Sequence, residues 1–415
     1  MTRKNLLSIL GPGILVAATG VGAGDLATAA FTGAKLGVAV LWVVILGAFF
    51  KFVLNEGLTR WQLATGRSIL EGAMSLLGRP AQYAFLIYFL AWSFMVATAL
   101  MAASGVAAQA IFPISSDPST GKIIYGIGHS LIGLALVYLG GYRLFEKVMG
   151  VCIALMFFTV ITTAILLTPD WHIILNGLIS PTIPELGGEG LAWTIALMGG
   201  VGGTVTVLSY GYWIREEGRS TPKDLSISRI DLATGYLMTA LFGLAMVIIG
   251  SSIQIEGRGA SLIIDLSDML GREIGPIGQW MFLIGAWGAI FSSLLGVWQS
   301  VPYIFTDLWR LIQGRKNSSQ QPINIKSKCY RRYLYGLATI PMIGLWVGFA
   351  QMQKFYAIIG ALFIPMLALT LLLLNGQAKW IGVQHRNHPL TTIILILILL
   401  FFLMAGSLTV QKILG

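Results

Sequence analysis

The sequence predicts an all-α membrane protein with about eleven transmembrane helices. Apolar residues make up 56% of the 415 positions and charged residues only 11%, whereas a soluble domain has roughly 25% charged residues. Apolar runs of about 20 residues, the length that crosses a hydrocarbon core of about 30 Å, recur along the whole chain. Composition and run length together therefore place the chain in a lipid bilayer.

The apolar runs define the individual spans. The first run is too long for a cleavable signal peptide and lacks a convincing cleavage site. We expect one transmembrane domain over residues 1–415, with two five-span halves at about 7–168 and 190–375. The expected spans are 7–36, 39–58, 82–112, 123–141, 144–168, 190–213, 230–253, 276–305, 333–351, 354–375 and an extra helix at 390–411.

The net charge of +10 follows the predicted topology. With the N-terminus and the basic linker 310–332 in the cytoplasm, most Lys and Arg lie inside, as the positive-inside rule requires for a plasma (inner) membrane protein. This topology leaves the C-terminus external. It also disfavours a nucleic-acid partner, because no basic face with interleaved aromatics remains to be explained. The basic residues left on the outside are Lys35, Lys122, Arg258, Arg272, Lys354 and Lys412.

No motif of an enzyme or of a bound cofactor stands out. The glycine-rich stretch Gly20–Gly24 lacks the preceding strand and the soluble βαβ unit of a dinucleotide site. Cys152 and Cys329 are too few and too far apart for a clustered thiolate site. We therefore expect a protein that is not an enzyme and has no cofactor.

Glycines interrupt two spans at corresponding positions. The first span reads GPGILVAATGVGAGDLATAAFTGAKLG, and the sixth reads LAWTIALMGGVGGTVTVLSYGYWI. Each glycine costs about 1 kcal/mol against alanine inside a helix. Broken helices at matching positions of two halves indicate an inverted-repeat secondary transporter with a substrate site between the breaks. The alternative is close helix packing through small residues.

Asp25 is the acid placed beside the first break. A carboxylate at membrane depth costs about 3 kcal/mol or more, which makes it a candidate for binding a cation or a proton. The alternative is that Asp25 caps the half-helix that begins at Leu26. The two roles are compatible, since one carboxylate oxygen can cap while the other binds.

Opposite Asp25, the sixth span offers only oxygen ligands. The hydroxyls of Thr204, Thr206 and Ser209 and the carbonyls around Gly203 are hard donors, which suit Mg²⁺ or Mn²⁺ better than softer metals. Lys51 and Glu56 in the second span, with Tyr210, are candidates for gating or coupling. Structural pairing is the favoured role for both, because Lys51 lies one helical turn from Asn55 and Glu56 lies one turn from Arg60.

The first two spans resemble those of the NRAMP family of divalent metal transporters. Matching features include the stretch Gly11–Gly13 and the stretch Thr65–Arg67, and the similarity is clear over some 65 residues. The resemblance implies the LeuT-like fold of two inverted five-helix repeats with broken helices 1 and 6. It also implies Mn²⁺ or Fe²⁺ as the usual cargo, moved with protons.

The motifs of that family are altered in this chain. Its first-helix motif Asp-Pro-Gly-Asn falls on Gly22-Ala23-Gly24-Asp25, and its sixth-helix Met-Pro-His falls on Val205-Thr206-Val207. The acidic third-helix positions linked to proton movement fall on Ala99 and Ala102. A thioether that favours transition metals is therefore missing. The expected binding residues are Asp25, Gly22, Ala23, Gly203, Thr204, Val205, Thr206 and Ser209.

These observations predict a transporter or facilitator of a divalent metal ion, with Mg²⁺ or Mn²⁺ favoured over Fe²⁺ and Cd²⁺. The bilayer is its other partner, and protons are a candidate co-substrate. Two alternatives stay open. One is a carrier of a small organic or anionic solute on the same fold, because helix N-termini at a break bind carboxylates. The other is a membrane receptor or assembly factor that transports nothing.

Overall fold

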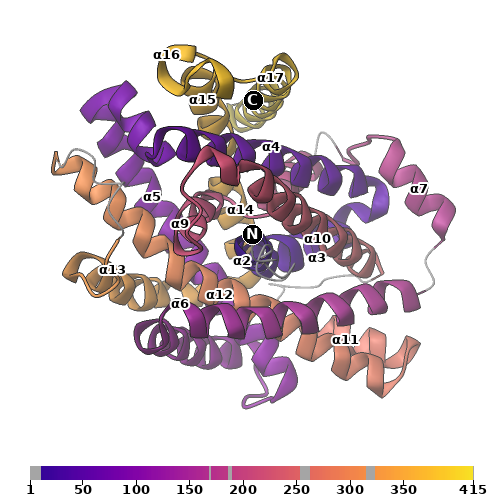
Figure 1. Ribbon diagram of the computed structural model, residues 1–415. Coiled ribbons are helices and arrows are strands. Elements are labelled where there is room, and N and C mark those ends of the chain that lie inside the picture. The colour runs from indigo at the N-terminus through magenta and orange to yellow at the C-terminus, as the bar shows by residue number, and fades with distance from the viewer. Residues whose placement is uncertain (1–10, 168–169, 186–188, 253–261, 315–322, 415) are drawn as a thin grey trace, which may run out of the picture.

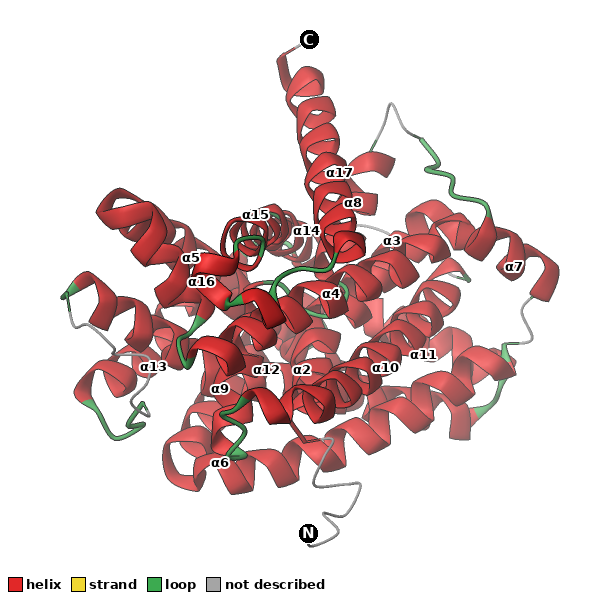
Figure 2. Ribbon diagram, turned by 45° about the horizontal axis from the view of Figure 1, so that its top comes forward, coloured by secondary structure: helices red, strands yellow, loops and turns green. Residues whose placement is uncertain are grey.

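The computed structural model describes residues 11–167, 170–185, 189–252, 262–314 and 323–414, and within these ranges it contains helices and loops but no strand. Figure 2 shows helices joined mostly by short loops. The predicted all-α class is therefore confirmed. The first residues of the expected span 7–36 and the middle of the expected linker 310–332 lie outside the described residues.

The first span of the protein is composite. Helix α2 (Gly11–Gly20), the π-helical segment η1 (Val21–Thr28) and α3 (Ala29–Leu36) follow one another without a loop. A 3-10 turn, η2 (Gly37–Val40), connects α3 to the second span, α4 (Leu41–Thr65).

Two long helices contain the third, fourth and fifth spans. In α5 (Ile69–Ile111) the chain turns at Gly78, whose φ of 77° lies in the left-handed region, just before Pro80. The rest of α5 forms the third span. Helix α6 (Pro118–Leu166) begins at a proline, and the Asp117 side chain caps it. Its apolar stretches 118–140 and 144–166 are the fourth and fifth spans.

The second half begins with another composite span after the short helix α7 (Trp171–Ile179). The sixth span consists of α8 (Gly190–Gly200), the 3-10 turn η3 (Val205–Leu208) and α9 (Ser209–Glu216). The remaining elements are η4 (Pro222–Asp224), α10 (Leu225–Ser251), α11 (Leu262–Glu273), α12 (Pro276–Ile312), α13 (Lys328–Thr339), η6 (Ile340–Trp346), α14 (Phe349–Ala361), α15 (Phe363–Asn375), α16 (Ala378–Ile381), η7 (Val383–His385) and α17 (Pro389–Leu414).

The helices account for the predicted spans. Within the described residues, eight helical stretches are long and apolar enough to cross a membrane, and the shorter apolar helices Gly11–Gly20 and Pro389–Met404 add to them. The count of eight is below eleven because the stretch Asp25–Thr65 joins parts of two expected spans. The ninth expected span is divided between α13 and η6.

The two composite spans lie at the centre of the helix bundle. Helices α2 and α3 pack against α10, and α12 packs against α2, η1, α5 and α6. Figure 1 shows α2 and α3 in the middle of the molecule, with α10 and α12 beside them. The residues that the sequence assigns to a substrate site are therefore shielded from lipid by other helices.

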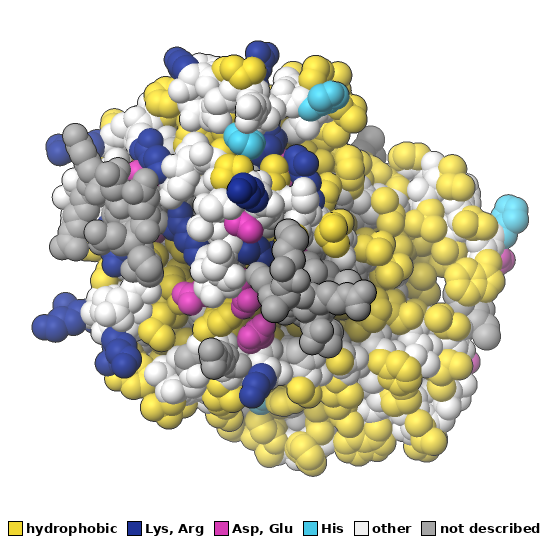
Figure 3. All heavy atoms as spheres, in the orientation of Figure 1, with side chains coloured by type: hydrophobic (Ala, Val, Ile, Leu, Met, Phe, Trp, Pro, Cys, Tyr) yellow, Lys and Arg dark blue, Asp and Glu magenta, His cyan; other side chains and the backbone are white. Residues whose placement is uncertain are grey.

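The outer surface has the character expected of a protein in lipid. Large apolar side chains are widely exposed, with Leu139 at 80% and Ile179 at 76% of their full accessible area. In Figure 3 apolar side chains cover the right and lower parts of the face, while Lys and Arg gather toward its left and upper parts. The apolar part is too large for a soluble surface and is suited to contact with acyl chains.

Candidate functional site

The sixth span unwinds between α8 and η3. Val201 has extended dihedral angles (φ −53°, ψ 125°), and Gly202 and Gly203 follow with φ of 72° and 88°. Only glycine enters this left-handed region at low cost, so these two glycines permit the turn. The segment leaves backbone carbonyls of α8 and of the turn without partners inside the helix.

The first span does not unwind. Segment η1 is a π-helix, and the residues at its two ends, Gly20 and Ala29, both keep right-handed helical angles. The hydroxyl of Ser293 in α12 accepts a hydrogen bond from the Gly22 N–H at 2.6 Å and donates one to the Ala18 carbonyl at 2.6 Å. A π-helical turn of this kind changes the helical register and often marks a functional site.

The two altered segments are in direct contact. A Cβ atom added to Gly20 would lie 2.8 Å from the Gly203 backbone nitrogen and 2.9 Å from the carbonyl carbon of Gly202. Such distances are shorter than carbon and nitrogen atoms tolerate, so only glycine at position 20 allows this approach. The π-helical segment of the first span and the unwound turn of the sixth therefore lie side by side.

Asp25 lies within the π-helical segment and is fully buried. Its Oδ1 and Oδ2 atoms accept a hydrogen bond from the Gly202 N–H at 3.3 and 3.5 Å. The carboxylate therefore faces the unwound turn of the other half. The π-helix continues through Asp25, so no separate half-helix begins at Leu26. This contact links the acid of one break to the backbone of the other.

Lys51 of α4 also reaches the unwound turn. Its side chain is 1% exposed, and its Nζ donates hydrogen bonds to the carbonyls of Gly199, Val201 and Gly203 at 2.8, 2.9 and 2.6 Å. An ammonium group has three N–H donors, so these three carbonyls use all of them. The sequence predicts structural pairing for Lys51, but its partners are the carbonyls of the break.

The hydroxyl groups expected to bind cargo differ in their availability. The indole N–H of Trp92 donates to Thr204 Oγ1 at 2.8 Å, so that oxygen is already engaged. Thr206 Oγ1 lies next to Gly203, and the buried Ser209 hydroxyl has no hydrogen-bond partner among the described residues. Val205 is fully buried and contributes no ligand atom beyond its backbone.

Two further expected residues belong to the π-helical segment. The N–H of Gly22 is bound by Ser293, and a Cβ at this position would lie 2.6 Å from the Ser293 side chain. Gly22 therefore allows α12 to approach. Ala23 lies in η1, and its side chain lies outside the described part of the structure.

Tyr210 belongs to a different polar cluster. Its hydroxyl donates to Asp231 Oδ2 at 2.9 Å and to the Ser228 carbonyl at 3.1 Å. The buried Asp231 also accepts from the Gly13 N–H at 2.8 Å and from Arg219 at 2.8 Å. This cluster joins α2, α9 and α10 and lies away from the unwound turn.

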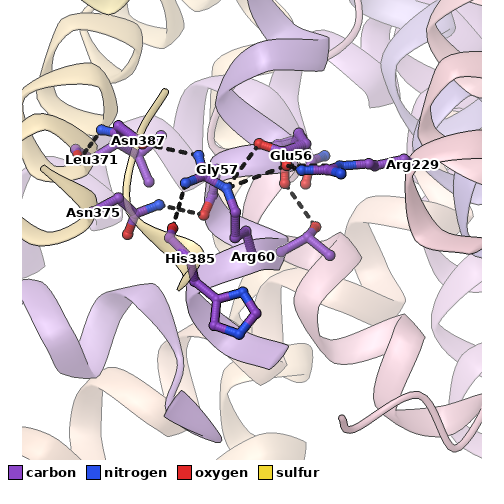
Figure 4. A network of polar contacts seen from close by, with 10 residues as sticks. Glu56, Gly57, Arg60, Arg229, Leu371, Asn375, His385 and Asn387 are labelled. Carbon is purple, nitrogen blue, oxygen red and sulfur yellow. Dashed lines mark hydrogen bonds and ion pairs between the residues drawn. The ribbon is translucent and has the colours of Figure 1, made fainter. Parts of the chain in front are cut away.

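Glu56 is paired with basic residues, as its spacing to Arg60 predicts. It accepts from Arg60 Nε at 3.3 Å and from the Arg229 guanidinium at 2.7 and 3.0 Å. Figure 4 shows Arg60 extending from Glu56 to the chain beside α15, where it donates to the His385 carbonyl and to Asn387 Oδ1. These contacts are consistent with a structural role that fixes α4 against α10 and the connection to α17.

Several polar residues that contact the breaks or their surroundings escape the sequence analysis. Trp92 carries no distinguishing pattern, because a single tryptophan is common in an apolar span. The adjacent pair Ser292-Ser293 is interpreted from the sequence only as packing hydroxyls. Asp307 of α12 is a buried acid whose Oδ2 accepts from Ser68 Oγ at 2.8 Å and from Tyr212 OH at 2.9 Å. Its sequence signal, an acid within an apolar helix, is the same signal that identifies Asp25.

The site as a whole brings one acid and one base to an unwound backbone segment. No group of three or more His, Cys, Asp or Glu side chains gathers in the part of the chain that the structure describes. Oxygen atoms from the backbone, Asp25, Thr206 and Ser209 are the groups that can bind a solute here. This donor set suits a hard cation or a small polar solute.

Solved structures support the fold. The manganese transporter of Eremococcus coleocola, in complex with an aromatic bis-isothiourea substituted compound, superimposes with a TM-score of 0.67 at 18% identity, covering 99% of this chain and 92% of that chain. MhsT in complex with L-phenylalanine gives a TM-score of 0.63 at 16% identity, with 98% of each chain covered. The expected LeuT-like fold is therefore confirmed.

Sequence relatives point the same way. The divalent metal cation transporter MntH 1 of Pseudomonas aeruginosa is 27% identical over 368 residues, which cover 85% of this chain and 79% of the relative. The uncharacterized protein PM0681 of Pasteurella multocida is 24% identical over 408 residues, with 92% and 90% covered. The model of the natural resistance-associated macrophage protein-like (Nramp) family matches residues 13–411. The chain therefore belongs to the Nramp family, whose members are membrane transporters and not enzymes.

Proposed function

We propose that this protein moves a divalent metal cation across the membrane by alternating access, with the cargo bound between η1 and the unwound turn of the sixth span. The observation that carries the proposal is the fully buried Asp25 carboxylate facing the turn at Gly202. A buried carboxylate next to backbone oxygens that have left the helical hydrogen-bond pattern is a typical cation site in broken-helix transporters. The name of the Pseudomonas aeruginosa relative supports the same cargo class.

We further propose that Mg²⁺ or Mn²⁺ is preferred over Fe²⁺ and Cd²⁺. The donors available at the site are oxygen atoms, and the buried Val205 side chain supplies no thioether that would favour softer ions. The metal is cargo in this proposal and not a cofactor. Protons remain a candidate co-substrate, although Ala99 and Ala102 offer no titratable group at the third-span positions.

The test is metal flux into proteoliposomes that contain the purified full chain. We expect uptake of Mn²⁺ and Mg²⁺ by the parent and its loss in Asp25→Ala, because the variant lacks the single acid at the break. Asp117→Ala is the matched control, since this exposed acid caps α6 away from the site. Parent-like uptake by Asp25→Ala would show that the cargo site is wrongly assigned.

A second candidate function is transport of a small organic or anionic solute. The observation in its favour is the Lys51 ammonium bound to the carbonyls of the break, because this charge offsets that of Asp25. A site without net charge suits a zwitterion as well as a cation. Uptake of a radiolabelled amino acid that is unaffected by Mn²⁺ would favour this function over metal transport.

The orientation that we propose follows from the charge distribution. The N-terminus and the linker 310–332 are cytoplasmic, and the C-terminus is external, in the plasma (inner) membrane. We expect a single cysteine placed in the linker to resist membrane-impermeant maleimide in intact cells and to react after permeabilisation. Labelling of this cysteine before permeabilisation would show that the linker is external and that the proposed orientation is wrong.

A further inference from the structure

The unwound turn of the sixth span binds one positive charge of the protein itself, the Lys51 ammonium. The carbonyls of Gly199, Val201 and Gly203 converge on a single point, which the Lys51 Nζ occupies. Gly199 lies in the last turn of α8, where the helix dipole favours a positive charge. Freed carbonyls at a break bind ions in this class of fold, so the same three oxygens are also candidate ligands for a free cation.

The ammonium group of Lys51 is held by neutral oxygens and not by an acid. None of the ion pairs within 4.0 Å among the described residues involves Lys51. The aliphatic part of the side chain packs at the turn, since a Cβ on Gly202 would lie 3.5 Å from Lys51 Cγ. The position of the Lys51 ammonium is therefore determined by its contacts with the unwound turn.

Lys51 and Asp25 contact the same turn from different helices. The Gly202 N–H points to Asp25, while the carbonyls on either side of it, from Val201 and Gly203, point to Lys51. The two side chains together have no net charge when both are ionised. A divalent cation that enters next to Asp25 therefore meets a positive charge within the same buried site, where repulsion is strong.

We propose that Lys51 lowers the affinity of the site for divalent cations by acting as a tethered cation. Its ammonium occupies the carbonyls of the sixth-span break in the cargo-free protein, and a divalent cation uses these carbonyls only after displacing it. This inference rests on the proposed metal transport and assigns to Lys51 a role that the charge pattern alone does not reveal. Removing the charge at position 51 should strengthen metal binding.

The experiment measures Mn²⁺ and Mg²⁺ binding to the purified full chain in detergent by isothermal titration calorimetry. The variants are Lys51→Met, which removes both charge and donors, and Lys51→Gln, whose amide keeps two N–H donors for the carbonyls. The Gln variant covers the case in which the Met variant does not fold. Lys122→Met is the matched control, because Lys122 is another buried lysine, and its Nζ donates to the Val347 carbonyl at 2.9 Å, outside the site.

We expect Lys51→Gln and Lys51→Met to bind the metals at least about tenfold more tightly than the parent, because the repulsion from the ammonium is gone. Lys122→Met should bind like the parent. A second readout is thermal unfolding: Mn²⁺ should raise the melting temperature of Lys51→Met more than that of the parent, since the metal replaces the lost partner of the carbonyls.

The outcomes separate this inference from the proposed function. If the parent binds metal through Asp25 and the Lys51 variants bind with parent-like or lower affinity, Lys51 does not compete and the inference is overturned, while metal transport stands. If only the Lys51 variants bind metal, the inference holds and the cargo of the parent must be another solute. If no variant binds a divalent cation, both proposals fail.

Discussion

The first and sixth spans both depart from α-helical geometry at the centre of the molecule, but their backbones do so in different ways. The first span widens into a π-helix over Val21–Thr28, and the residues at its two ends keep right-handed angles. The sixth span unwinds through Gly202 and Gly203, whose φ angles are positive. Glycines such as Gly20 and Gly22 of the first span therefore allow neighbouring segments to approach closely. Gly202 and Gly203 of the sixth span instead adopt backbone angles that other residues reach only at a cost.

The two segments also satisfy their displaced backbone groups differently. In the first span the Ser293 hydroxyl serves both the Ala18 carbonyl and the Gly22 N–H. In the sixth span the Lys51 ammonium donates hydrogen bonds to three carbonyls, and Asp25 accepts one from the Gly202 N–H. A neutral hydroxyl thus supports the π-helical segment, and two charged side chains, Lys51 and Asp25, support the unwound turn. The sixth-span turn is therefore the part of the site whose occupancy depends on charge.

Among the substitutions that probe these two segments, we expect Gly202→Ala to lower the free energy of unfolding most. Alanine at a φ of 72° costs about 1–2 kcal/mol, and its Cβ would lie 2.9 Å from a ring carbon of the buried Tyr236. Overpacking of this kind adds about 1–3 kcal/mol. We expect a loss of about 3 kcal/mol in the free energy of unfolding, measured by denaturant titration in detergent, together with loss of transport.

Gly128→Ala in α6 is the control for this prediction. This glycine lies in a helix, and a Cβ placed on it has no heavy atom within 4 Å. We expect a gain of about 0.5–1 kcal/mol from the higher helix propensity of alanine. If the two substitutions change the free energy of unfolding equally, glycine is not required at the positive φ of the sixth-span turn. The proposed contrast between the π-helical segment and the unwound turn would then be wrong.

The fold could be predicted from the sequence because its signals are long and repeated. Each apolar run is long enough to identify a span by itself, and interruptions such as Gly199–Gly203 mark where a helix is broken. The resemblance of the first two spans to a known family then implied the LeuT-like arrangement of these spans. The division of the ninth span into α13 and the 3-10 turn η6 was not predictable, because Pro341 permits a helix break without requiring one.

The contacts of the site were less predictable than its location. Its position as a lone acid in a glycine-rich stretch made Asp25 a candidate site residue, but no sequence pattern connects Lys51 to carbonyls about 150 positions away. The number of glycines also does not distinguish a π-helix from an unwound turn, since both segments contain several. Those details depend on how α4 and α12 pack against the breaks, and that packing is a property of the tertiary structure.

We expect a smaller loss of stability when the hydrogen bonds from α12 to the first span are removed. Two adjacent serines of α12 allow a matched comparison. Ser293→Ala removes the hydroxyl that bridges Ala18 and Gly22, and it leaves a buried N–H and a carbonyl without that partner. Unsatisfied buried groups cost about 1–3 kcal/mol. Among the described residues, the Ser292 hydroxyl donates only to the Ala289 carbonyl of its own helix, at 2.8 Å, so Ser292→Ala should cost less than about 0.5 kcal/mol.

Denaturant titration of the two alanine variants in the same detergent makes the comparison direct. The serines are neighbours on α12 and both are fully buried, so side-chain size and depth are matched. We expect Ser293→Ala to lose about 1.5 kcal/mol, half of the loss at Gly202, because it removes hydrogen bonds without forcing the backbone to move. Equal losses for the two serines would mean that the π-helical segment is held by its own helix, and the neutral bridge would then have no part in shaping the site.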